Sequence, residues 1–276
     1  MTNEFPGRSG FVEANGLRMH YNEWGQGPVL VWLHGGGPGA NGLSNYSLNV
    51  PHFPDYRNII FDLPRYGQSS KPVIDGSFFT FLGQSIAGAL DGLGISKASF
   101  VGNSLGGATA VRVAIQRPDL VERLILMAPG DMAAPGEGPS EPLKLMLKAL
   151  GGDPSRENVV GFLRSIVYDR SLLTESLLEE RYLAAQHPEV IATAKDSRFG
   201  PDLLVPELPK INAPALLIWG REDAILPVAG GYRAVEALPN AELRVISQCG
   251  HWVQYEHPQW FNLAVRSFLA EPTRSV

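Results

Sequence analysis

The chain has 276 residues, 44% of them hydrophobic, which is enough to bury a large core either as one α/β domain with an insertion or as two domains. Its net charge of −5 gives no electrostatic attraction to nucleic acid or to an anionic membrane, so we expect a small-molecule partner instead. The first residues lack an apolar leader and no run of about 18 apolar residues occurs, so we expect neither a secretion signal nor a membrane span.

Elements of the first half of the chain alternate between strands and helices. Apolar and polar residues alternate over 17–24, which predicts a half-exposed strand, and the uninterrupted apolar run 29–33 predicts a strand covered on both faces of a largely parallel sheet. The elements expected next are a strand over 57–61, a helix over 80–93, a strand from 99, a helix that stops before Pro118, and a strand over 124–128. This order favours a parallel, doubly wound sheet.

The regular alternation stops between residue 129 and about residue 213. A turn-rich stretch over 129–142 opens this span, helical patterns follow over 141–149, 156–167, 172–185 and 189–194, and no strand pattern intervenes. We interpret the span as an all-helical lid inserted between two sheet strands. An independent helical domain is the alternative, but roughly 80 residues with a turn-rich start have little core of their own.

The sheet pattern returns after the lid. A strand is predicted over 215–219, a helix near 228–238, a strand over 242–247 and a final helix over 258–269. The expected domain organisation is therefore an α/β core in two parts, residues 1–130 and residues 214–276, with the lid over 131–213 between them.

One stretch combines the end of a strand, a glycine-bracketed serine and the start of a helix, namely Gly102-Asn103-Ser104-Leu105-Gly106. It matches G-x-S-x-G, in which the serine occupies a strained turn and the glycines remove side chains that would collide with the neighbouring strand and helix. The following helix directs its N–H groups and positive dipole end at the same place, which favours the negative charge formed when serine attacks a carbonyl. Such common residues also form plain turns, so the context has to support the motif.

A glycine run over 34–40 follows the buried strand at 29–33 directly. A flexible linker is the alternative, but glycines in this position more often let backbone approach backbone or ligand closely. Serine hydrolases of this kind take one oxyanion donor from this loop and the other from the residue after the nucleophile, which predicts Gly36 and Leu105 as the oxyanion hole. We expect His34 to brace the loop.

Two more chemical groups follow predicted parallel strands, at the sheet edge where open α/β sheets bind ligands. Ser104, Asp223 and His251 occur in the order serine, acid, histidine used by this class of hydrolase, which predicts a catalytic triad. His251 would act as general base on Ser104, and Asp223 would fix the imidazole tautomer and stabilise the imidazolium. Asp131, which also follows a strand, and Glu222 are alternative acids, and His251 could instead be a surface residue.

The single cysteine, Cys249, excludes an internal disulfide, cannot supply a zinc site by itself, and fits a reducing, cytoplasmic setting. It is also a rival nucleophile in principle. Because it lacks the glycine-bracketed turn that surrounds Ser104, we expect Cys249 to be a small buried residue. We therefore predict neither a disulfide nor a metal site.

Several segments together give the sequence a resemblance that covers nearly the whole chain, the lid included. It resembles the meta-cleavage product hydrolases, which are α/β-hydrolases that cut a carbon–carbon bond in the vinylogous 1,5-diketones made by extradiol ring cleavage of catechols. The segments that carry this resemblance are 33–40 (LHGGGPGA), 44–46 (SNY), 102–107 (GNSLGG), 219–223 (WGRED) and 249–254 (CGHWVQ). They are much more specific than the triad, which a great many esterases share.

The resemblance implies an α/β-hydrolase fold, with a mostly parallel eight-stranded sheet, helices on both faces and an inserted helical lid. It also implies a serine-dependent hydrolase of aromatic compound degradation, which converts a 2-hydroxy-6-oxohexa-2,4-dienoate-type compound to 2-hydroxypenta-2,4-dienoate and a carboxylic acid. The implied partners are this small-molecule dienoate and further copies of the chain in a homo-oligomer, dimer or higher. No metal or organic cofactor is implied.

Cleavage of a carbon–carbon bond releases a carbanion, so the dienol has to ketonise first and spread the charge over a conjugated system. In the family an arginine on a lid helix and an asparagine before the nucleophile stabilise this charge, and these match Arg181 and Asn103. The resemblance further implies that Asn45 helps to hold the substrate and that Trp252 lines the pocket wall. The alternatives are a solvated Arg181 that pairs with a nearby glutamate, and a core position for Trp252.

The sequence departs from the family pattern at two positions. Arg65 stands in the loop over 64–67 where the family usually has glycine, which leaves the conformation of that loop open. Ile166 occupies a lid position where members with larger substrates often carry an aromatic residue, which leaves the size of the acyl group open. Neither position belongs to the predicted catalytic residues.

Two other functions are compatible with the same sequence. A carboxylesterase or lactonase would use the same Ser-His-Asp triad, and activity on a nitrophenyl ester but not on a ring-fission dienoate would identify it. The other is a ligand-binding receptor with a vestigial hydrolase fold. The intact set of Ser104, Asp223 and His251 argues against a receptor, and turnover of any substrate would exclude it.

Overall fold

The computed structural model describes residues 5–132 and 138–272, with an eight-stranded sheet at its centre. The strands lie in the order β1-β2-β4-β3-β6-β7-β9-β10. β2 is antiparallel to β1 and β4, and the other neighbours are parallel. The strands are β1 (Arg8–Ala14), β2 (Leu17–Trp24), β3 (Val29–Leu33), β4 (Arg57–Phe61), β6 (Ala98–Asn103), β7 (Val121–Met127), β9 (Ala215–Gly220) and β10 (Ala241–Ile246). This sheet confirms the predicted fold class.

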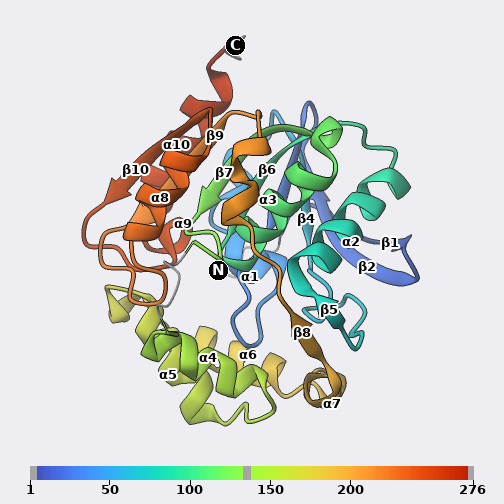
Figure 1. The fold of residues 1–276 in the computed structure, drawn as a ribbon. Coiled ribbons are helices and arrows are strands. Elements are labelled where there is room, and N and C mark those ends of the chain that lie inside the picture. The colour runs from blue at the N-terminus through green and yellow to red at the C-terminus, as the bar shows by residue number, and fades with distance from the viewer. Residues whose placement is uncertain (1–4, 133–137, 273–276) are drawn as a thin grey trace.

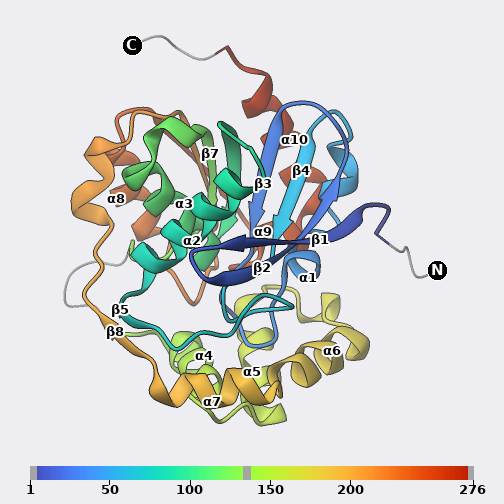
Figure 2. The same cartoon turned by 90° about the vertical axis from the view of Figure 1, so that its right-hand side faces the viewer.

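Helices cover both faces of the sheet, as Figures 1 and 2 show. The helices that pack on one face are α2 (Phe78–Gly92), α3 (Leu105–Gln116) and α8 (Ala229–Ala237). Those on the other face are α1 (Gly42–Tyr46), α9 (Val253–Glu256) and α10 (Pro258–Ala270). Short 3₁₀ turns lie at Val50–His52, Pro118–Leu120, Arg170–Leu172 and Val205–Lys210.

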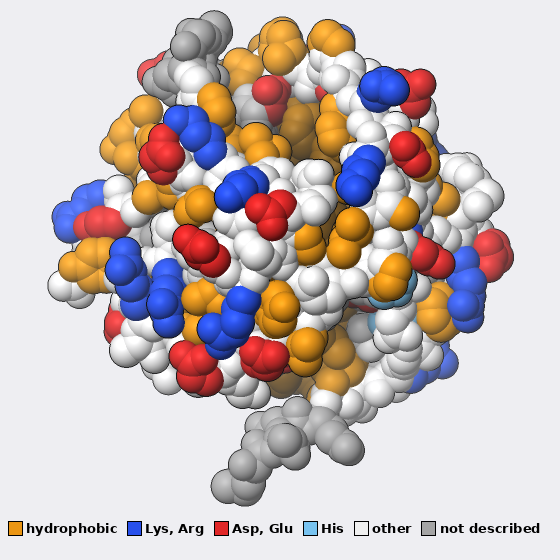
Figure 3. Space-filling model, turned by 90° about the horizontal axis from the view of Figure 1, so that it is seen from below, with side chains coloured by type: hydrophobic (Ala, Val, Ile, Leu, Met, Phe, Trp, Pro, Cys, Tyr) orange, Lys and Arg blue, Asp and Glu red, His pale blue; other side chains and the backbone are white. Residues whose placement is uncertain are grey.

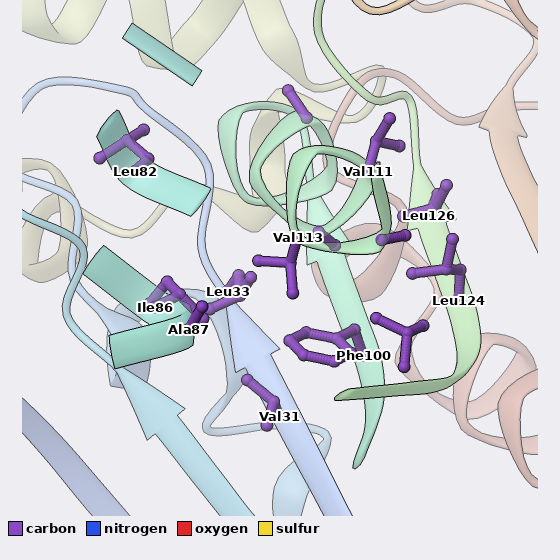
Figure 4. Close-up of a cluster of buried hydrophobic side chains, with 14 of the residues drawn as sticks. Val31, Leu33, Leu82, Ile86, Ala87, Phe100, Val111, Val113, Leu124 and Leu126 are labelled. Atoms are coloured by element: carbon purple, nitrogen blue, oxygen red, sulfur yellow. The ribbon is translucent and has the colours of Figure 1, made fainter. Parts of the chain in front are cut away.

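Each face of the sheet buries its own hydrophobic core. Side chains alternate along β3, so that Val31 and Leu33 lie in the core under α2 and α3, while Leu30 and Trp32 lie in the core on the opposite face. Figure 4 shows the first core, where side chains of β3, β6 and β7 meet those of α2 and α3. Because both faces are buried, the strand sequences are apolar without interruption, which is why the sequence predicts them.

Between β7 and β9 the chain leaves the sheet and forms α4 (Glu141–Leu150), α5 (Arg156–Ile166), α6 (Glu175–Ala185) and α7 (Pro188–Asp196). These helices lie together at one end of the molecule, at the bottom of Figures 1 and 2. Ser140, Ser155 and Thr174 cap α4, α5 and α6 by accepting a backbone N–H bond. The apolar side chains of α4, α5 and α6 pack with Ile225 and Trp252, which belong to the loops after β9 and β10.

One prediction for this span is wrong. Residues Arg198–Gly200 form a short strand, β8, which pairs in parallel with β5 (Asp75–Ser77), whereas no strand was expected between 129 and 213. All three residues of β8 are exposed, so no apolar pattern marks the strand in the sequence. Of the turn-rich stretch predicted over 129–142, residues 133–137 lie outside the described residues.

The surface formed by the inserted helices carries both signs of charge. Figure 3 views this end of the molecule and shows Lys and Arg side chains interspersed with Asp and Glu. Arg156 pairs there with Glu175, and Lys144 with Glu141. Within the described ranges, no helix combines the length and the apolar character needed to cross a membrane.

Gly106 permits the close approach of α3 to β3. A Cβ atom at this position would lie 1.9 Å from the carbonyl oxygen of Leu33. Gly106→Ala is therefore expected to lower the free energy of unfolding by about 3 kcal/mol or more, because backbone has to move to admit the methyl group. Urea denaturation measures the change, with Gly138→Ala as the control because a Cβ at Gly138 meets open space. Equal stability of the two variants would contradict the steric argument.

Candidate active site

Ser104 occupies the sharp turn between β6 and α3, with φ of 52° and ψ of −111°. Non-glycine residues rarely adopt a positive φ, and such strain concentrates at functional sites. A Cβ at Gly102 would lie 2.5 Å from the carbonyl oxygen of Gly106, so both flanking glycines are sterically required, as the motif predicts. The turn leaves Ser104 partly exposed among buried neighbours.

His251 and Asp223 form a buried pair. His251 Nδ1 lies 2.7 Å from Asp223 Oδ2, and since a carboxylate accepts, Nδ1 carries the proton. The other oxygen, Oδ1, accepts the backbone N–H groups of Ile225 and Leu226, each at 2.9 Å, which fixes the carboxylate. His251 Nε2 is thus the free acceptor, and His251 lines the same cavity as Ser104. No direct hydrogen bond joins the Ser104 and His251 side chains in the described chain. In catalytic pairs such a gap often closes when substrate binds.

The alternative acids and nucleophile are engaged elsewhere. Asp131 Oδ2 accepts the backbone N–H of Leu204, and Glu222 Oε2 accepts that of Cys249 at 3.1 Å. Burial raises the pKa of the Cys249 thiol far above its usual range, so the thiol stays protonated. Among the described residues no group of three His, Cys, Asp or Glu side chains is placed to hold a metal ion.

The predicted oxyanion donors line one cavity together with Ser104. Gly36 follows β3, and Leu105 is the first residue of α3. Neither backbone N–H donates a hydrogen bond within the described part of the chain, so both are available to a ligand. The Tyr66 hydroxyl donates to the Gly36 carbonyl at 2.8 Å, which holds the peptide of this loop in place.

His34 braces the glycine loop, as predicted. Its Nδ1–H donates to the Gly35 carbonyl at 2.8 Å, and its Nε2 accepts the backbone N–H of Leu63 at 3.0 Å. Burial lowers the pKa of His34 to about 4, so the ring is neutral at ordinary pH. With both nitrogens engaged, His34 has no atom left for acid–base chemistry.

A cavity of about 20 Å³ is lined by the four predicted substrate-binding residues, together with Ser104 and His251. We call it the polar lobe, and its remaining lining is Gly35, Gly36, Gly37, Met146, Phe162, Ile166 and Ile225. Asn45 Oδ1 accepts from the Trp252 indole at 3.2 Å, and Asn103 Nδ2 donates to the His251 carbonyl at 3.3 Å. Trp252 is buried and also stacks on Tyr255. It therefore lines the cavity wall and belongs to the hydrophobic core at the same time.

Arg181 is buried in the wall of the polar lobe, and only 2% of its surface is exposed. Its Nε and Nη2 both donate to the Pro38 carbonyl, at 3.0 and 2.9 Å, and the guanidinium lies 5.6 Å from the Trp252 ring centre. No carboxylate lies within 4.0 Å of it in the described residues. Burial lowers the pKa of Arg181 to about 10, which still leaves the cation in place at neutral pH. A solvated helix position does not fit this burial.

A second cavity, of about 260 Å³, meets the first at Ser104, Gly36 and Met146. We call it the apolar lobe. It is lined further by Arg65, Tyr66, Phe78, Leu105, Leu147, Leu150, Gly151, Val190, Ala194 and Phe199. Ser104 therefore lies at the junction of a small polar lobe and a larger apolar one.

The family of this chain follows from its similarity to known proteins. A family model described as the alpha/beta hydrolase fold matches residues 28–258. A solved meta-cleavage product hydrolase from Pseudomonas fluorescens IP01 is 30% identical, with a TM-score of 0.85 over 94% of this chain and 97% of that one. The chain belongs to the meta-cleavage product hydrolases of the α/β-hydrolase family. The family predicted from the sequence is thereby confirmed.

Two relatives of this meta-cleavage product hydrolase are named for different substrates. A 2-hydroxy-6-oxononadienedioate/2-hydroxy-6-oxononatrienedioate hydrolase from Burkholderia vietnamiensis (strain G4 / LMG 22486) is 43% identical over 92% of this chain and 91% of its own length. A 2-hydroxy-6-oxo-6-phenylhexa-2,4-dienoate hydrolase from Burkholderia cepacia is 38% identical over 92% of each chain. The chain is accordingly an enzyme, a C–C bond hydrolase that acts on ketonic substances.

A second Ser-His-Asp line in this meta-cleavage product hydrolase lies away from both lobes. The Ser9 hydroxyl lies 2.7 Å from His20 Nε2, and His20 Nδ1 lies 2.8 Å from Asp62 Oδ2. Asp62 also accepts the backbone N–H groups of Gly42 and Gln68, so it joins β2 to the loops after β3 and β4. Ser9 and His20 line neither lobe, and we assign this set to stability.

Sequence reasoning missed Glu256, which organises the loop that carries His251. Its Oε1 accepts the backbone N–H of Gly250 at 2.9 Å, and its Oε2 accepts that of Tyr168, after α5, at 2.6 Å. Burial raises the pKa of Glu256 above its usual range. The His251 N–H donates to the Ile166 carbonyl at 2.7 Å, so the inserted helices and the histidine loop are tied together twice.

Glu256→Ala is expected to lower the free energy of unfolding of this hydrolase by about 2 kcal/mol or more, because the buried Gly250 N–H and the partly buried Tyr168 N–H lose their acceptor. Hydrolysis should fall as well, because His251 would no longer be held. Chemical denaturation and initial rates measure the two effects. The exposed Glu236→Ala serves as control. A Glu256→Ala enzyme with the stability of the control would show that the carboxylate supports nothing.

Proposed function

We propose that this enzyme hydrolyses the C5–C6 bond of a 2-hydroxy-6-oxohexa-2,4-dienoate-type ring-fission product to 2-hydroxypenta-2,4-dienoate and a carboxylic acid, with Ser104 as nucleophile. The observation that carries the proposal is a single cavity lined by Ser104, by His251, which is bonded to Asp223, and by Arg181, a buried cation with no carboxylate partner in the described chain. An esterase needs the first set but not the buried cation. The names of the relatives support the same chemistry.

The polar lobe is proposed to hold the dienoate end of the substrate. Its carboxylate would pair with Arg181, because a buried guanidinium binds a carboxylate strongly. Asn103 and Asn45 add amide groups near the 2-hydroxyl. The substrate ketonises when the 2-hydroxyl proton moves to C5, which leaves ketones at C2 and C6. The C2 ketone then lies in the polar lobe, where its oxygen can accept the negative charge that forms when the C5–C6 bond breaks.

The bond is then broken by nucleophilic attack. Ser104 attacks C6 while His251 takes its proton, and the C6 oxyanion is held by the N–H groups of Gly36 and Leu105. When the C5–C6 bond breaks, its electron pair passes through the conjugated system to the C2 oxygen, which takes up a proton as His251 gives up the one that it removed from Ser104. Water, activated by His251, then hydrolyses the acyl-serine and releases the carboxylic acid.

We further propose that residues 131–213 act as a lid over the core formed by 1–130 and 214–276. The polar lobe has a volume of about 20 Å³, which holds roughly one water molecule and not a dienoate. Phe162 of α5 and Arg181 of α6 both line it, so substrate access requires these helices to shift. Such loop and lid motions are common in enzymes that exclude water from the reaction.

A paired assay tests the proposed reaction. Purified enzyme is given a ring-fission dienoate in one reaction and a nitrophenyl ester in another, and loss of the dienoate absorbance is followed. We expect rapid turnover of the dienoate to a pentadienoate and a carboxylic acid, with slower turnover of the ester. Turnover of the ester alone would overturn the proposal and favour a carboxylesterase or lactonase.

Location and assembly stay predictions. We propose a cytoplasmic homo-oligomer, dimer or higher, which acts on a small-molecule dienoate. Light scattering coupled to size-exclusion chromatography measures the mass of the particle. A mass equal to that of one 30.0 kDa chain would rule out the oligomer.

A further inference from the structure

The apolar lobe contains one charged side chain among the residues that line it, Arg65. The rest of the lining is apolar or aromatic apart from Ser104, the glycines and the Tyr66 hydroxyl, which is committed to the Gly36 carbonyl. An apolar acyl group alone would need no cation in this position. Arg65 therefore requires an explanation in terms of the ligand that fills the lobe.

The guanidinium of Arg65 is half-buried, and the described part of the chain offers it no carboxylate partner. Its Nη1 donates to the Ser197 hydroxyl at 3.3 Å, and its Cζ lies 6.0 Å from the Phe199 ring centre. Within the described residues no Asp or Glu oxygen lies within 4.0 Å of it, whereas Arg112 pairs with Asp202. Burial lowers the pKa of Arg65, because no nearby carboxylate compensates for the lost water. An anionic ligand would supply this compensation.

The backbone of Arg65 is also unusual. Its φ is 77°, in the left-handed region where glycine is favoured. The loop keeps its hydrogen bonds, since the Arg65 N–H donates to the Ser70 carbonyl at 2.8 Å. This chain thus keeps the loop conformation and accepts the strain of a side chain, which is expected where the side chain has a task.

We propose that Arg65 binds a carboxylate on the C6 substituent, so that this enzyme prefers ring-fission products with an anionic acyl group over those with a neutral alkyl or aryl group. This inference rests on the proposed function, in which Arg181 holds the dienoate in the polar lobe and the Ser104 hydroxyl lies next to C6 of the substrate. The C6 substituent has to extend from Ser104 into the apolar lobe, where the methylene groups contact apolar walls and the terminal carboxylate meets Arg65.

The test compares two dienoate substrates of equal length, one with a C6 chain that ends in a carboxylate and one with a chain that ends in a methyl group. In the wild-type enzyme the ratio of their kcat/KM values should favour the carboxylate by about tenfold or more, as expected for a charge-assisted hydrogen bond. Arg65→Met removes the charge and keeps the side-chain length, and Arg65→Gly also removes the backbone strain. Both should bring the ratio close to one.

Two further variants complete the design. Arg65→Lys keeps the charge and should retain part of the preference. Arg156→Met removes an exposed cation from α5, and its ratio should equal that of wild type. An unchanged ratio in Arg65→Met and Arg65→Gly, or a wild-type preference for the methyl-ended chain, overturns the inference. If wild type cleaves neither substrate, the proposed function itself fails, and the two failures are thereby distinguished.

Discussion

Ser104→Ala is expected to lower dienoate hydrolysis roughly a millionfold, the size of effect seen when the nucleophile of a triad is removed. Without the hydroxyl, His251 has no proton to take and no acyl-serine forms. The polar lobe keeps Arg181, Asn103 and Asn45, so substrate binding should remain detectable. Single-turnover kinetics measure the loss, and the change in the dienoate absorption spectrum on mixing measures binding.

Ser99→Ala is a suitable control for this variant. Ser99 is buried in the same strand, β6, but at the end opposite to Ser104, and it lines neither lobe. We expect hydrolysis at the wild-type rate in that variant. Dienoate turnover by Ser104→Ala at a rate within tenfold of the control would remove Ser104 from the role of nucleophile.

The central sheet could be predicted because its strands are buried on both faces. Val29–Leu33 and Ala215–Gly220 are apolar at every position or nearly so, which is expected of short strands covered on both faces of a parallel sheet. Strand β8 could not be predicted, because Arg198–Gly200 is exposed and is a strand only by virtue of its pairing with Asp75–Ser77. Pairing between segments over a hundred residues apart leaves no local pattern.

The catalytic side chains could be predicted for a related reason. Ser104, Asp223 and His251 each lie in the turn or loop that follows a parallel strand, so the strand pattern places them at one edge of the sheet. The supporting contacts of Glu256 could not be predicted, because its partner Tyr168 is 88 residues away and lies in the segment after α5. Glycine-rich turns identify the positions of the reacting groups, whereas the residues that hold them are identified by tertiary contacts.

Arg181 shows where sequence reasoning left two alternatives. Its helix, α6, places Glu179, Glu180 and Arg181 in succession, so no single polar face is apparent, and the pattern leaves a solvated position open beside the favoured substrate-binding one. The burial follows from the glycine loop, because a Cβ on Gly39 would lie 2.0 Å from the Arg181 carbonyl. Only a glycine at this position, with its φ of 66°, lets α6 approach so closely.

Arg181→Ala is expected to lower kcat/KM for dienoate cleavage roughly a hundredfold or more, the cost of removing one member of a buried ion pair with the substrate carboxylate. The same variant should lose far less activity on a nitrophenyl ester. The leaving group of an ester departs as an oxyanion and needs no cation in the polar lobe. Initial rates on both substrates, expressed as a ratio, measure the difference.

The ratio is needed because Arg181 also donates twice to the Pro38 carbonyl in the glycine loop. Damage to that loop would displace the oxyanion donor Gly36 and slow both reactions alike, whereas loss of the dienoate contact slows only carbon–carbon cleavage. Arg164→Ala, which removes another arginine from the inserted helices outside the polar lobe, should leave both rates unchanged. Equal losses on the two substrates in Arg181→Ala would assign this residue to loop support and leave the carbanion without its proposed cation.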